Sequence, residues 1–313
     1  MKKFVEMNVY ESAVERIHYI FDEFENVVIS FSGGKDSGVV LNLALEIAKE
    51  RNELDKLIVY HMDYEAQYQE TTDFVTQTFE SLPEEVKKHW VCLPVMAQCS
   101  TSMFQNYWQP WKREEQNIWC RELPQYDFVI SEDNFPWDFD YEVWDYDFND
   151  LFAKEIQKEY GKTAFLIGIR TQESLHRFKA VTKDGTNTEY KKNNWTTKVN
   201  NELINAYPIY DWLVDDVWIA HAKFGWKYNK LYDLMYQAGV PINAMRVASP
   251  FNDSAQDSLK LYKILDPNNW GKLIGRVNGV NFTALYGGTT AMGWRNIKKP
   301  EHFTWKEYME FLL

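Results

Sequence analysis

Six consecutive residues near the amino terminus combine the groups that hold a phosphate. The segment Ser32-Gly33-Gly34-Lys35-Asp36-Ser37 offers hydroxyl donors, an ammonium group and a carboxylate. Two adjacent glycines let successive backbone N–H groups turn toward one anion, and a helix that begins there adds the positive end of its dipole. Asp36 is a hard oxygen ligand suited to a Mg²⁺ ion that bridges phosphates. The segment therefore predicts a phosphate-binding loop.

The residues around this loop change their hydrophobic period, as a strand, a tight loop and a helix would. Positions 27–31 form a short β-branched run, and positions 39–48 carry apolar side chains at helical spacing. An amphipathic helix is expected before the strand, over residues 8–25. This order places the loop at the carboxyl end of a strand and the start of a helix.

Further strands alternate with helices along the chain. We predict strands at 57–62, 91–95 and 164–169, and helices at 70–81 and from about 150 to Gly161. Such alternation predicts an α/β fold with a parallel, Rossmann-like sheet, whose ligands bind outside the carboxyl ends of the strands. The candidates for nucleotide and substrate binding at those ends, besides the loop, are Ser30, Met62, Asp63, Glu65, Gly168 and Arg170.

Two segments stand outside this alternation. Residues from about 97 to 150 are rich in tryptophan and in acidic residues, and we expect an insertion packed over the site, with a partner-docking surface as the alternative.

We divide the chain into a nucleotide-binding domain, 1–245, and a C-terminal extension, 246–313, that closes on the site. Arg246 and Arg295 are its candidate anion contacts, and ordinary surface positions are the alternative.

The overall charge limits the classes of partner. A net charge of −12 and an isoelectric point near 5.1 do not indicate a nucleic-acid-binding surface over the whole chain, so nucleic acid is considered only as a possible substrate.

The three cysteines lack the paired spacing of metal or redox motifs, so we expect reduced thiols in the cytoplasm. No apolar run approaches the length of a membrane span. The basic stretch 177–198 reads as a solvated hairpin or as a phosphate-contacting arm.

The loop and a downstream segment both resemble known signatures. Ser-Gly-Gly-Lys-Asp-Ser does not fit the Walker A pattern and resembles the PP-loop of N-type ATP pyrophosphatases. The stretch from Gly168 to Ser174, followed by Arg177, is similar to the Gly-x-Arg-x-x-Glu-Ser segment of phosphoadenosine phosphosulfate (PAPS) reductases and the small subunit of sulfate adenylyltransferase. The resemblance covers roughly residues 25–220. It implies an adenine nucleotide alpha hydrolase-like fold that binds ATP with Mg²⁺.

Within this superfamily the chain looks most like IbrA-type (immunoglobulin-binding regulator A) PAPS reductase-like proteins. This resemblance lies in the aromatic insertion, the stretch 241–246 and the glycine-containing tail. That resemblance implies a heteromeric ParB/sulfiredoxin-like partner. PAPS reductases carry a catalytic cysteine in a C-terminal segment, whereas this chain has no cysteine after Cys120. Thiol-dependent reduction by that route is therefore not expected. Cys120 is the candidate for a reactive thiol, and a buried structural thiol is the alternative.

Three functional hypotheses follow. The first is an adenylating enzyme that cleaves ATP between the α and β phosphates, acting in sulfur transfer or nucleic-acid modification, with Lys35, Asp36 and Arg170 as catalytic residues. Its acceptor would be bound by four further residues, namely Glu65, Glu173, Arg177 and Arg246. The second is an enzyme that binds a sulfonucleotide, and the third is a nucleotide-sensing regulatory subunit.

Overall fold

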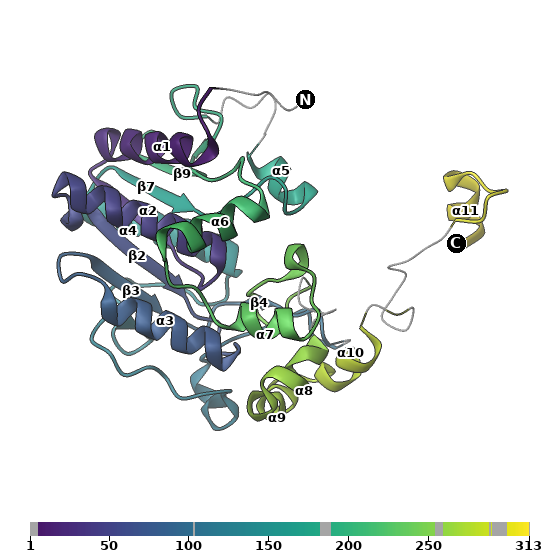
Figure 1. Cartoon of the computed structure of the whole chain (residues 1–313). Helices are drawn as coiled ribbons and strands as arrows, with labels where there is room; N and C mark the ends of the chain where they lie inside the picture. The colour runs from purple at the N-terminus through teal and green to yellow at the C-terminus, as the bar shows by residue number, and fades with distance from the viewer. Residues whose placement is uncertain are drawn as a thin grey trace.

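A seven-stranded, mostly parallel sheet forms the centre of the protein (Figure 1). The structure is a computed structural model that describes residues 6–102, 104–181, 189–253, 259–287, 289 and 299–312. In spatial order the strands are β6 (Val129–Ile130), β3 (Lys87–Val91), β2 (Leu57–Met62), β1 (Asn26–Ser30), β7 (Thr163–Ile167), β9 (Leu203–Ala206) and β8 (Thr196–Lys198). Neighbouring strands run parallel except β8, which runs antiparallel to β9. The predicted α/β class with a parallel sheet is confirmed.

Helices cover both faces of the sheet because the side chains of β1 alternate between two cores. Val27 and Ile29 pack with the helices of one face, whereas Val28 packs with Phe148 and Phe152 on the other. The first face carries α1 (Val9–Glu23), α2 (Lys35–Arg51), α3 (Gln69–Ser81) and α6 (Val214–Phe224), and the second carries α4 (Asp145–Tyr160). The central strand is thus buried on both sides.

The remaining elements lie outside the central sheet and the helices that cover its two faces. They are the antiparallel pair β4 (Ala97–Gln98) and β5 (Tyr107–Trp108), the helices α5 (Leu175–Val181), α7 (Leu231–Gln237), α8 (Tyr262–Leu265), α9 (Pro267–Arg276), α10 (Val280–Tyr286) and α11 (Trp305–Leu312), and the 3₁₀ turns η1 (Leu54–Lys56), η2 (Arg113–Ile118), η3 (Ile242–Ala244) and η5 (Leu259–Leu261). A separate apolar core joins the insertion to the C-terminal extension through residues such as Trp108, Phe251 and Leu273. None of the helices in the described ranges is long and apolar enough to cross a membrane.

Most predicted elements are confirmed, and one strand is displaced. The helix expected from about 150 ends as predicted, at Gly161, whose φ of 94° favours glycine. The third strand was expected at 91–95, but β3 covers Lys87–Val91. Lys87 pairs with Ile58, and Val91 pairs with Met62, the last residue of β2. The apolar residues after Val91 therefore lie beyond the paired region. Pro94 cannot donate to a sheet hydrogen bond, which explains why the apolar run does not continue the strand.

The basic stretch 177–198 is only partly the solvated hairpin expected from its composition. Its first residues belong to the helix α5, and its last belong to the edge strand β8. Residues 182–188, where the turn of the expected hairpin would fall, lie outside the described residues.

A buried ion pair fastens the insertion and the C-terminal extension to the end of β2. Glu65 is fully buried with φ of 63°, and its carboxylate accepts hydrogen bonds from the backbone N–H groups of Trp111 (2.9 Å) and Cys120 (2.8 Å). Arg276 of α9 donates to the same carboxylate through Nε at 2.8 Å. Removing one partner of such a pair leaves a buried charge without compensation.

We therefore expect Arg276→Met to lower the free energy of unfolding by about 3–5 kcal/mol, measured by urea denaturation. Arg113→Met is the matched control, because Arg113 pairs with Asp133 where both side chains are more than half exposed, at 57% and 69%. A loss from Arg276→Met no larger than that of the control would contradict a structural role for the Glu65–Arg276 pair.

His89 on β3 predicts a dependence of stability on pH. The ring lies 6.0 Å from Phe152, and burial lowers the pKa of His89 from 6.5 to about 4. Between these values the unfolded chain binds a proton that the folded chain does not, so stability falls as pH drops from 6.5 toward 4. We expect the wild type to lose up to about 3 kcal/mol relative to His89→Gln over this interval, measured by denaturation at each pH. Parallel pH curves for the two proteins would refute the assignment.

Candidate functional site

The phosphate loop lies between β1 and α2, where the backbone requires a glycine. Gly33 has φ of 74°, and a Cβ at this position would lie 2.8 Å from Val75 Cγ2. Gly34 is the N-cap of α2 and supplies no side chain to the helix. The first N–H groups of α2 have no acceptor within the helix, which is the arrangement that binds anions at a helix start. Ser32 Oγ and Ser37 Oγ lie 3.0 Å apart beside them.

A buried charge cluster stands at the start of α2. Lys35 Nζ lies 3.0 Å from Asp36 Oδ2, and Arg170 Nε donates to Asp36 Oδ1 at 2.5 Å. Lys35 and Arg170 are each 3% exposed. Arg170 reaches Asp36 because β7 pairs directly with β1 and because Gly168 admits the helix, since a Cβ there would lie 2.8 Å from Ser37 N. The structure thus brings together the three residues predicted to be catalytic.

A cavity of about 180 Å³ opens beside this cluster. Its lining residues include Lys35, Arg170, Glu173 and Arg246. Arg246 Nη2 donates to the Glu173 carbonyl at 3.1 Å. Arg177 lies next to the cavity, with its Nε 3.8 Å from Glu173 Oε2 and its side chain half exposed. Three of the four predicted substrate-binding residues, Glu173, Arg177 and Arg246, therefore gather in one place.

Residues from far along the chain cover the loop. The Tyr232 hydroxyl accepts a hydrogen bond from Lys35 N at 3.1 Å, and the Met245 carbonyl accepts one from Lys35 Nζ at 3.4 Å. Asn229 Nδ2 donates to the Gly33 carbonyl at 3.2 Å. His221 Nε2 lies 3.0 Å from the Lys35 carbonyl, and burial lowers the pKa of His221, which favours the neutral ring with Nε2–H as donor. Sequence reasoning missed these residues because no motif spacing links them to the loop.

The remaining candidates lie at the expected edge of the sheet. Ser30 and Met62 are the last residues of β1 and β2, and both are partly buried. The Asp63 carboxylate is fully buried and accepts from Trp90 Nε1 at 2.7 Å and from Arg121. Burial raises the pKa of Asp63, but the Arg121 charge outweighs that effect, so the pKa is lowered and the carboxylate is ionised.

For Glu65 the structure corrects the role expected from the sequence. Its carboxylate is occupied by donors of the protein, so it anchors the insertion where a substrate contact was expected. Arg295, the other expected anion contact of the extension, lies outside the described residues.

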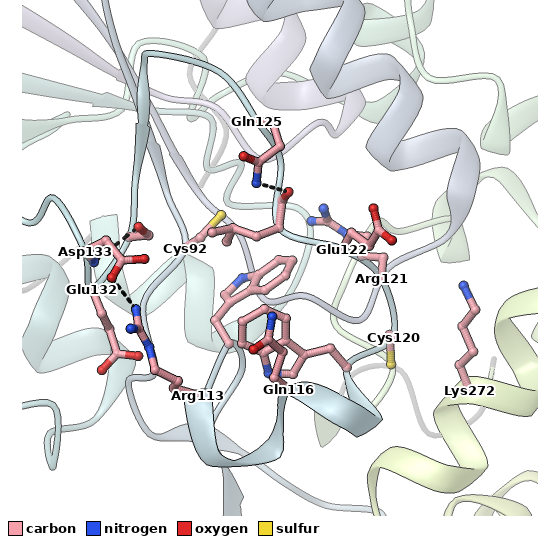
Figure 2. Close-up of a pocket in the computed structure, with 14 residues that line it drawn as sticks. Cys92, Arg113, Gln116, Cys120, Arg121, Glu122, Gln125, Glu132, Asp133 and Lys272 are labelled. Atoms are coloured by element: carbon pink, nitrogen blue, oxygen red, sulfur yellow. Dashed lines mark hydrogen bonds and ion pairs between the residues drawn. The ribbon is translucent and has the colours of Figure 1, made fainter.

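A larger pocket of about 780 Å³ lies under the insertion (Figure 2). Figure 2 shows Cys92 and Cys120 well apart around it, with Arg121 and Lys272 near Cys120. All three cysteines are free and buried. Burial raises the pKa of the Cys92 and Cys120 thiols, so both are protonated at neutral pH. The structural alternative for Cys120 is the one that this geometry favours.

No group of three or more His, Cys, Asp or Glu side chains that could hold a metal ion is found in the described part of the chain. Asp36, the predicted magnesium contact, directs its two oxygens toward Lys35 and Arg170. A magnesium ion at this loop would thus depend on the oxygens of a bound phosphate.

Comparisons with known proteins assign both parts of the chain. Residues 26–238 match the phosphoadenosine phosphosulfate reductase domain, and residues 239–313 match a domain of unknown function, DUF3440. The chain is 35% identical over 314 residues to the uncharacterized protein YbdN of Escherichia coli (strain K12), covering 98% of this chain and 75% of YbdN. The match to YbdN does not establish the narrower IbrA-type assignment, which stays a prediction.

Solved structures show a more distant similarity. The FMN adenylyltransferase of Candida glabrata aligns with a TM-score of 0.40 at 13% identity, covering 72% of this chain and 57% of that one. The PAPS reductase of Candida auris, solved with phosphate, aligns with a TM-score of 0.37 at 14% identity, covering 74% of this chain and 93% of that one. These scores are too low to support an argument about function. The reductase-domain match, by contrast, extends over more than half of the sequence and shows that the chain belongs to the phosphoadenosine phosphosulfate reductase domain family.

Proposed function

We propose that this protein binds Mg-ATP at the loop Ser32–Ser37, cleaves the bond between the α and β phosphates, and transfers the adenylyl group to an acceptor. The observation that supports it is the convergence of the N-terminal end of α2, Lys35 and Arg170 beside a small cavity. Loops of this composition bind phosphates through the backbone and through one mobile cation.

The charges around the cavity support an anionic ligand. Four cations (Lys35, Arg170, Arg177 and Arg246) face two carboxylates (Asp36 and Glu173), which leaves two positive charges, four minus two. This excess occurs in a chain whose net charge is −12. A cleft with a local excess of one sign concentrates ligands of the opposite sign. The site is thus suited to a polyphosphate together with an anionic acceptor.

The residues divide the reaction between two sides of the α phosphorus. A nucleophile of the acceptor would form a bond to this phosphorus while the bond to the bridging oxygen breaks and pyrophosphate leaves with the electron pair. Lys35 and the N–H groups of α2 would stabilise the charge that develops on pyrophosphate. Arg170 and Arg246 would hold the acceptor by paired hydrogen bonds. Magnesium would enter with the nucleotide and neutralise part of its charge, with Asp36 as the neighbouring carboxylate.

Family membership favours a second candidate, binding of a sulfonucleotide such as PAPS. A 3′-phosphate on the ribose would need further cations at the carboxyl edge of the sheet. Lys191 belongs to the basic stretch 177–198 that was expected to form a solvated hairpin or to contact a phosphate, and it pairs with Glu23 at 2.6 Å, at the end of α1 that leads into β1. It lies at the opposite edge from the loop, so the geometry supports ATP over PAPS. The third hypothesis is a regulatory subunit that binds ATP without turnover and acts through a ParB/sulfiredoxin-like partner.

Pyrophosphate release tests the proposed reaction. We expect Lys35→Ala and Asp36→Ala each to lower Mg-ATP-dependent release by about 100-fold or more, because one mutation removes the cation at the leaving group and the other removes the carboxylate that pairs with both Lys35 and Arg170. Release is measured with and without cell extract as the source of the acceptor. Lys191→Ala is the matched control, since this lysine is exposed and distant from the loop.

The outcomes separate the three hypotheses. Release that both mutations abolish supports adenylyl transfer. Tight ATP binding without release, even with extract, contradicts an autonomous enzyme and favours the regulatory hypothesis. Displacement of ATP by a lower concentration of PAPS favours the sulfonucleotide hypothesis.

Tyr232 predicts the effect of a single hydroxyl on affinity. Because its oxygen already accepts the Lys35 N–H, a phosphate that uses this donor must displace it. We expect Tyr232→Phe to bind ATP about fivefold more tightly, measured by calorimetry. Tyr236→Phe serves as the control, because that side chain is exposed one turn further along. Weaker binding by Tyr232→Phe would mean that the hydroxyl itself contacts the nucleotide.

A further inference from the structure

A third cavity, of about 520 Å³, shares Tyr232 and Met245 with the residues that cover the phosphate loop. Its lining residues come from α6, from α7, from the segment between them, and from Ile242 and Met245 in and after η3. Nine described residues line it, of which four are aromatic, two are aspartates and none is Lys, Arg or His. Neither the phosphate loop nor the proposed reaction uses this cavity.

Three of the aromatic side chains pack edge to face at one wall of the cavity. Trp218 lies 5.4 Å from Tyr228 and 5.2 Å from Tyr232, with interplanar angles of 84° and 81°. Tyr236 follows Tyr232 by one helical turn and continues the same wall. Aromatic faces carry negative potential, and several of them around one cavity attract a cation.

Carboxylates at the cavity add to this potential. Asp215 precedes Trp218 by three residues on α6, and Asp233 accepts a hydrogen bond from the Tyr228 hydroxyl at 2.9 Å. Lys230, an exposed lysine outside the cavity, already lies 4.4 Å from the centre of the Tyr228 ring and 3.3 Å from Asp233. Tyr228 thus already has a cation near its ring, and Asp215 is the cavity carboxylate that Lys230 leaves for a ligand.

The rim of the cavity resembles a protein interface. Ile219, Tyr236 and Ile242 are 60%, 67% and 42% exposed around it. An arginine suits the interior better than a lysine, because its planar guanidinium stacks on aromatic rings while bonding a carboxylate in its own plane. Exposed apolar side chains around a pocket for one anchor residue are typical of interfaces.

We propose that this cavity binds an arginine side chain presented by a partner protein, with the guanidinium among Trp218, Tyr228 and Tyr232 and near Asp215. The charge of the cavity and the geometry of its walls select the arginine, and the apolar rim receives the residues that flank it. The proposal does not depend on adenylyl transfer, so it can fail or succeed separately from the proposed function.

A pair of short peptides tests it on the full chain. The probe is the peptide Ac-Leu-Gly-Arg-Gly-Leu-NH₂, and its citrulline counterpart is a neutral control of nearly the same shape. Binding is followed by the indole ¹H–¹⁵N signal of Trp218, identified by its loss in Trp218→Phe. We expect saturable shifts with the arginine peptide at a Kd on the order of 1 mM, and at least about fivefold weaker binding of the citrulline peptide.

Variants connect the signal to the cavity. Tyr236→Ala and Asp215→Asn should each weaken binding of the arginine peptide by about three- to tenfold. Tyr146→Ala, the same change at an exposed tyrosine on α4, should leave binding unchanged. Tyr236 is exposed, so its loss tests binding without removing core packing. Equal binding of the two peptides, no saturable shift, or an unchanged affinity in both cavity variants would overturn the proposal.

Discussion

One carboxylate, that of Asp36, holds the candidate site together. It lies between two cations that are almost completely removed from water, Lys35 and Arg170. Each of these charges would be strongly unfavourable in the interior without a partner. Glu173 is a second carboxylate near Arg170, at 3.8 Å, and with Arg177 and Arg246 the surroundings carry four cations against two carboxylates. The helix dipole adds to this positive excess, which favours an anionic ligand.

This cluster fixes which strands must be neighbours. Asp36 comes from the segment after β1 and Arg170 from the segment after β7, and the two strands pair directly in the middle of the sheet. The same edge receives the insertion and the C-terminal extension, which Arg121 and Arg276 attach to Asp63 and Glu65. Acidic residues after β2 therefore anchor the surroundings of the site, whereas cationic residues after β1 and β7 form its interior.

Elements with local sequence signals were predictable, whereas contacts between residues far apart in the chain were not. The strand, loop and helix around Gly33 were predictable because their signals lie within a few tens of residues and agree with one another. Glu65 was expected at the correct edge, but its partner Arg276 is 211 residues away, so a structural role was not predictable from local pattern. The same holds for Tyr232, which is 197 residues from the loop amide that it contacts. The displaced β3 has another cause, because the buried apolar run after it resembles a strand yet lies beyond the register of β2.

Tyr232 belongs to two sites at once. Its hydroxyl contacts the amide of the phosphate loop, and its ring forms a wall of the aromatic cavity. A ligand that shifts this side chain in one site changes the free energy of binding in the other. Thermodynamic reciprocity then requires that the second ligand alter the affinity of the first by the same factor. If both proposed ligands bind, a single tyrosine would thus couple them and give heterotropic cooperativity.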